Sequence, residues 1–161
     1  MPKKAKEILM TLDEMAGLSQ VIVIDANCDG LIPEIKKVSK KTVVRDVREV
    51  TNTTNPLDDE IHDALQGLGV SQLVLVTENC KHFFTPKKRT EAKYFLVCLA
   101  KGEILLDVIA KDLIFALRHD PGLKGRRIAG DYKMVVLSKD YLKELRNRVK
   151  RPPTAKSKKT G

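Results

Sequence analysis

Aromatic residues make up only 4% of the 161 residues, and cysteine occurs only three times. No apolar run approaches the roughly 20 residues that span a bilayer, so the sequence predicts no transmembrane helix. The basic opening is followed by no apolar stretch or small-residue cleavage site. We therefore expect no secretory signal, a cytoplasmic location and no membrane partner. Cys28, Cys80 and Cys98 are odd in number and widely spaced, so no disulfide framework is expected.

Hydrophobic residues (42%) and charged residues (32%) occur in the proportions of a globular domain, and the length suits a single one. The net charge of +9 is concentrated at one end, because residues 143–161 carry eight Lys or Arg and one Glu. We expect one domain over residues 1–149 and a disordered basic tail over residues 150–161. Such a tail can bind a polyanion through counterion release, or it can be a solvated tail that improves solubility.

The periodicity of apolar residues predicts strands that alternate with helices. Strands are expected at residues 20–25, 42–47, 71–76, 94–100 and 133–138, and helices at residues 3–16, 31–38, 57–67, 103–118 and 139–149. Asn55 is the expected N-cap of the helix at 57–67, with Pro56 at its first position. Continuous apolar runs are typical of strands buried on both faces. The sequence therefore predicts an α/β fold with helices on a mostly parallel sheet.

Oxygen-bearing side chains follow the predicted strands, at the sheet edge where α/β folds bind ligands. Asp25 ends the first strand, and Glu78 and Asn79 follow the third. Asp58 and Asp59 open the helix whose first turn should face the same edge. Mg²⁺ and Mn²⁺ prefer oxygen ligands of this kind, which indicates a metal site. The alternative is that these acids only cap the following turns and helices.

Three segments resemble the short branch of the PIN-like nuclease domains. They are the strand Val21-Ile-Val-Ile-Asp-Ala-Asn27, the helix start Leu57-Asp-Asp-Glu-Ile61, and Leu73-Val-Leu-Val-Thr-Glu-Asn79 with Phe83. The resemblance covers roughly residues 20–100 and implies a three-layer α/β/α fold with a mostly parallel central sheet. It implies that Asp25 is the metal ligand of the first strand. Asp58, or failing that Asp59, matches the acid of the helix.

The sequence departs from the family pattern at two positions. Asn79 stands where the pattern expects Asp, and His82 stands where a further Asp is common. Glu78 is the nearest remaining acid, and Asp140, after the last predicted strand, could complete the cluster in a second register. These departures leave open a weaker site, a shifted ligand set or a domain that has lost catalysis.

The resemblance implies a Mg²⁺- or Mn²⁺-dependent ribonuclease, in which the metal lowers the pKa of a bound water and stabilises the transition state of phosphodiester hydrolysis. Catalysis would be carried by Asp25, Asp58 and Glu78, metal binding by Asp25, Asp58, Asp59, Glu78 and Asn79, and RNA binding by Arg126, Arg127, Lys150 and Arg151. Such a protein can be the toxin of a toxin–antitoxin pair, with RNA, an antitoxin or another protein, and a second copy of the chain as partners. The alternative is a catalytically degenerate PIN-like domain that binds RNA or a protein.

Other residues receive simpler interpretations. A zinc site formed by Cys28, Cys80 and His82 is disfavoured, because no close cysteine pair or fourth ligand is evident. His62 is interpreted as a solvent-facing helix residue. The run at residues 87–89 is interpreted as a solvated turn that would also suit phosphate contact.

Overall fold

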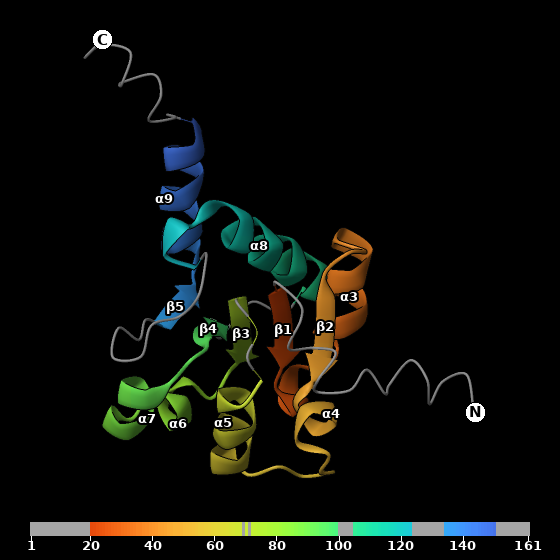
Figure 1. The fold of residues 1–161 in the computed structure, drawn as a ribbon. Coiled ribbons are helices and arrows are strands. Elements are labelled where there is room, and N and C mark those ends of the chain that lie inside the picture. The colour runs from red at the N-terminus through yellow and green to blue at the C-terminus, as the bar shows by residue number, and fades with distance from the viewer. Residues whose placement is uncertain (1–19, 69, 71, 100–104, 124–133, 151–161) are drawn as a thin grey trace.

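The computed structural model describes residues 20–150, except 69, 71, 100–104 and 124–133. Its sheet has five strands, all parallel to their neighbours, in the order β2-β1-β3-β4-β5 (Figure 1). The strands are β1 (Gln20–Ile24), β2 (Val43–Asp46), β3 (Gln72–Thr77), β4 (Phe95–Leu99) and β5 (Met134–Leu137). The predicted α/β class with a parallel sheet is confirmed, and each predicted strand is present within two residues of its expected bounds.

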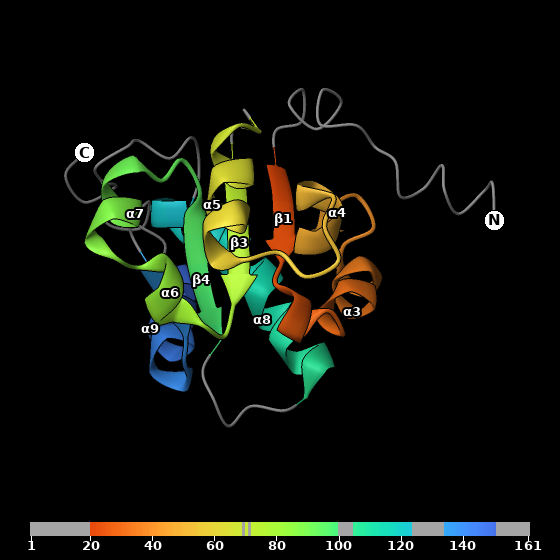
Figure 2. The same cartoon turned by 90° about the horizontal axis from the view of Figure 1, so that it is seen from below.

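Helices cover both faces of the sheet. α3 (Leu31–Val38), α8 (Leu106–His119) and α9 (Lys139–Lys150) form one layer, and α4 (Val47–Thr51), α5 (Asp58–Gln66), α6 (Cys80–Phe83) and α7 (Pro86–Glu91) form the other. Side chains alternate between the faces along each strand, so Ile22 and Ile24 pack with the first layer and Val21 and Val23 with the second. Figure 2 shows α5 in front of the sheet and α8 behind it.

The two layers differ from the predicted elements mainly in their short helices. α4, α6 and α7 were not predicted, because four to six residues carry too little periodicity to be recognised. α5 begins at Asp58, and its N-cap is Leu57 instead of the predicted Asn55. The reason is that Glu60 reaches back to accept a hydrogen bond of 2.7 Å from the Leu57 backbone N–H.

Some predicted segments lie outside the described residues. They include the helix at 3–16 and the basic tail from residue 151 onward, whereas Lys150, placed in the tail by the sequence, is the last residue of α9. No helix in the described part of the chain is long and apolar enough to cross a membrane.

Candidate functional site

The order of the strands creates a topological switch point between β1 and β3. β1 lies between β2 and β3, so the chain leaves β1 toward one side and later returns on the other. In Figure 2 the arrowheads of β1 and β3 lie next to each other. Ligands of open α/β sheets bind outside the carboxyl ends of the strands at such a point. We therefore take the residues that follow these two strands as the candidate site.

Asp25 and Thr77 lie at the centre of the switch point. Asp25 is only 7% exposed, and its carboxylate accepts a 2.7 Å hydrogen bond from Thr77 Oγ1 and a 2.8 Å bond from the Ala26 backbone N–H. Thr77 Oγ1 in turn accepts a 2.9 Å hydrogen bond from the Asn79 backbone N–H. The carboxylate therefore has two charge-assisted hydrogen bonds from the protein itself.

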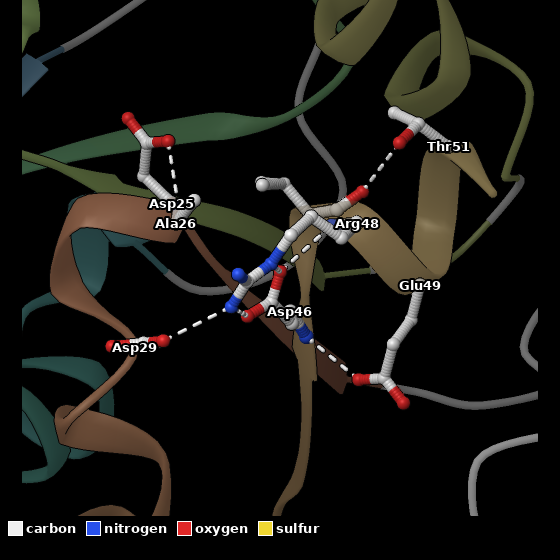
Figure 3. Close-up of polar contacts among 8 residues, drawn as sticks. Asp25, Ala26, Asp29, Asp46, Arg48, Glu49 and Thr51 are labelled. Atoms are coloured by element: carbon white, nitrogen blue, oxygen red, sulfur yellow. Dashed lines mark hydrogen bonds and ion pairs between the residues drawn. The ribbon is translucent and has the colours of Figure 1, made fainter. Parts of the chain in front are cut away.

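A second acidic cluster follows β1 and β2 and is neutralised by Arg48. Its guanidinium lies 2.5 Å from the carboxylate of Asp46, at the end of β2, and 3.0 Å from that of Asp29, after η1 (Ala26–Cys28) (Figure 3). Burial alone would raise the pKa of Asp46, but the hydrogen bonds and charge of Arg48 outweigh it and hold that pKa below its usual value. The same contacts raise the pKa of Arg48. In Figure 3 the Asp25 carboxylate points away from this cluster.

The two predicted acids of α5 also have basic partners. Asp58 Oδ2 lies 2.7 Å from His82 Nδ1, an ion pair when the imidazole is protonated. Asp59 lies 2.9 Å from Lys88 Nζ, and the hydrogen bond and charge of this lysine lower the pKa of Asp59. Lys88 Nζ also donates to the His82 carbonyl at 2.8 Å and lies over the Phe83 ring. α6 and α7 thus each place a basic side chain at the first turn of α5.

Glu78 and Asn79 occupy the segment between β3 and α6. The Glu78 side chain is exposed, and Asn79 is half-buried as the N-cap of α6. Cys28 is buried, and burial, reinforced by the charges of Glu78 and Asp25, raises the pKa of its thiol to about 12. The negative charges of Glu78 and Asp25 therefore both act on the Cys28 thiol.

The prediction that the cysteines form no disulfide is wrong. Cys80, at the start of α6, is bonded to Cys98 in β4, with their Cα atoms 5.8 Å apart. Cys98 is next to Thr77 in the register of β3 and β4, which brings two cysteines 18 residues apart together. Cys28 remains a free, buried thiol. Because Cys80 is bonded, it is not a thiolate ligand for zinc.

Two interpretations of basic side chains also need correction. His62 is 3% exposed and not solvent-facing, with Nδ1 2.6 Å from Tyr94 Oη and Nε2 2.8 Å from Glu91 Oε1. It lies beside Ile61 on the buried face of α5, which a finer phasing of the helix could have predicted. Lys88 belongs to α7 and is 9% exposed, so residues 87–89 are not a solvated turn.

The remaining predicted site residues lie apart from the switch point or outside the described residues. Arg126, Arg127 and Arg151 lie outside them, and Lys150 is exposed at the end of α9. Asp140 follows β5, which is separated from β1 by two strands, so it is distant from Asp25. The second register therefore does not bring Asp140 to the predicted cluster.

The side chains described do not form a donor set for a divalent ion. Within residues 20–150, as far as they are described, no group of three or more His, Cys, Asp or Glu is arranged to hold a metal. Asp58 and Asp59 have basic partners, and both oxygens of Asp25 accept hydrogen bonds. The geometry gives no support to the predicted Mg²⁺ or Mn²⁺ site, which stays a prediction.

The sequence interpretation missed the pair formed by Asp46 and Arg48. The signal was present, since Asp46 ends a predicted strand as Asp25 does, and Glu49 three residues later completes a capping box.

Comparison of the chain with protein-family models, with curated protein sequences and with solved structures gives no match.

Proposed function

We propose that this chain is a PIN-like domain that binds RNA and does not hydrolyse it. The parallel sheet and the buried Asp25 at its switch point are consistent with the PIN-like pattern of the sequence. The departure of the chain from that pattern at His82 and Asn79 supports binding over catalysis.

The observation that carries the proposal is the contact between Asp58 and His82. In the resemblance, both positions carry acids, and two nearby carboxylates need a cation between them because like charges raise each other's pKa. Here His82 Nδ1 lies 2.7 Å from Asp58, so a basic side chain, and not a second acid, faces the helix acid and forms an ion pair with it when the imidazole is protonated. The domain therefore compensates its helix acid with a side chain, where a nuclease would use a metal ion.

The charge of the chain supports RNA as the ligand. The net charge is +9, and residues 143–161 contribute eight Lys or Arg against one Glu. Phosphates bind such a segment by releasing counterions, without needing base-specific contacts.

Calorimetric titration with Mn²⁺ tests the loss of the metal site. We expect no saturable binding to the wild type and saturable binding to Asn79→Asp/His82→Asp, which restores both acids of the family pattern. His119→Asp/Asn147→Asp makes the same changes of residue type at exposed positions of α8 and α9 and should not bind. Saturable binding to the wild type that Asp25→Asn abolishes would contradict the proposal. Failure of the restored variant to bind would show that these two positions are not what removed the site.

A metal-dependent ribonuclease is the second candidate, favoured by one observation. Asp25 and Glu78 both act on the Cys28 thiol, so two acids lie near the switch point. If the wild type binds Mn²⁺, cleavage of labelled RNA that is lost in Glu78→Gln would establish this candidate.

A further inference from the structure

Charge is distributed unequally between the two helical layers. α3, α8 and α9 together contain nine Lys or Arg and five Asp or Glu. The helices α4 to α7 together contain five Lys or Arg and six Asp or Glu. In Figure 1, α8 and α9 lie above the sheet and α3 lies beside β2, whereas α4 to α7 lie below the sheet. A polyanion is therefore attracted to the layer of α3, α8 and α9 and not to the layer that contains the acids of the switch point.

Most cations of this layer form no ion pair with an acid in the described part of the chain. Its ion pairs are Lys37–Glu34, Arg146–Asp112 and Arg148–Glu144, so three of its nine basic side chains are paired within the described residues. Lys40 and Lys41 follow α3 and add two exposed charges. By contrast, Arg48 and Lys88 in the opposite layer both form ion pairs with acids. Unpaired cations can bind phosphate without first breaking a contact inside the protein.

We name the layer of α3, α8 and α9, together with Lys40 and Lys41, the basic layer. We propose that its exposed cations are the surface that binds RNA. Those with no ion pair among the described residues are Lys36, Lys40, Lys41, Lys111, Arg118, Lys139, Lys143 and Lys150. Basic residues in the last turn of a helix also favour its dipole, but Lys40, Lys41 and Lys111 lie outside last turns and need another explanation. The inference rests on the RNA binding proposed above and places it away from the sheet edge.

The contact is with the sugar–phosphate backbone and not with bases. The two aromatic side chains of the layer are half-buried and already engaged. Phe115 packs against His119 and Arg146, and the Tyr141 hydroxyl donates to Asp120 at 2.6 Å. With no free stacking platform in the described part of this layer, binding has little base preference and depends strongly on salt.

Fluorescence anisotropy with labelled oligouridine and oligoadenosine, over a series of salt concentrations, tests the assignment. The variant Lys36→Gln/Lys40→Gln/Lys41→Gln should bind both at least about ten-fold more weakly at low salt, with a salt slope less steep by about 2, since each single-strand phosphate contact contributes about 0.7. The control Lys81→Gln/Lys87→Gln/Lys93→Gln removes the same charge from exposed positions outside the layer and should bind like the wild type.

The outcomes separate this inference from the proposed function. If the wild type binds RNA and the basic-layer variant binds it with the same affinity and the same salt dependence, the assignment of the surface is overturned but the RNA proposal is not. Equal losses in both triple variants also overturn it, because net charge would then be sufficient. A wild type that binds neither oligonucleotide at low salt overturns the RNA proposal itself. Circular dichroism melting checks that both variants are folded.

Discussion

Replacing Thr77 by Val tests whether the hydroxyl at the switch point holds the ends of β1 and β3 together. Thr77 is fully buried, and Val has nearly its shape, so the change removes hydrogen bonds with little change in packing. The hydroxyl donates to Asp25 and accepts from the Asn79 backbone N–H. A hydrogen bond to a charged group contributes about 1.5–3 kcal/mol and a neutral one about 1 kcal/mol. We therefore expect the free energy of unfolding to fall by about 3 kcal/mol, which corresponds to a decrease in Tm of roughly 6–12 °C.

Urea denaturation followed by circular dichroism measures this loss. Thr53→Val is the matched control, because Thr53 Oγ1 is half-buried and donates a single 3.1 Å hydrogen bond to the Thr51 carbonyl. It should cost less than about 1 kcal/mol. If Thr77→Val costs no more than Thr53→Val, Asp25 does not depend on this hydroxyl, and the reasoning about the switch point is refuted.

Three further changes test the contacts around the site. Because the pKa of Asp46 is lowered in the folded state, this carboxylate stabilises the fold above its unfolded pKa of about 3.9, and the stabilisation is lost as pH falls through the folded pKa. Arg48→Met should therefore lower the free energy of unfolding at pH 7. Urea denaturation between about pH 5 and pH 2 should show that the free energy of unfolding of this variant falls less steeply with pH than that of the wild type. Cys80→Ser/Cys98→Ser opens a loop of 18 residues and should cost about 3 kcal/mol, and reductant should lower the Tm of the wild type but not that of the variant. His62→Ala should cost about 3 kcal/mol in the same denaturation assay, since it leaves a cavity and removes one buried and one partly buried hydrogen bond; a loss below about 1 kcal/mol would contradict its buried placement.

The strands could be predicted from the sequence because burial on both faces leaves a continuous apolar run. β1 and β3 show this most clearly, since every residue that they contribute to the two hydrophobic clusters is Val, Ile or Leu. Short helices could not be found in the same way, because their ends depend on caps. α7 follows the Thr85 cap with Pro86 at its start, a local signal that periodicity over a longer window does not detect.

The candidate site was predicted in its location but not in its contacts. Asp25 at the end of the first strand follows from the rule for α/β sheets alone. The pairing of Asp58 with His82 needs the position of α6 against α5, which no sequence pattern encodes. The bond between Cys80 and Cys98 likewise needs the pairing of β3 with β4. Contacts between segments far apart in sequence therefore decide whether the acids of this edge are free or neutralised.

The most direct test of a PIN-like domain that binds RNA without hydrolysing it is one anisotropy and gel experiment on labelled RNA, with Mn²⁺ or with EDTA. We predict that Mn²⁺ gives no gain in affinity over EDTA, since the contacts are with phosphates and compete with cations, and that the RNA stays intact after prolonged incubation in both conditions. Cleavage in Mn²⁺ that disappears in EDTA and in Asp25→Asn would contradict the account and establish a metal-dependent ribonuclease.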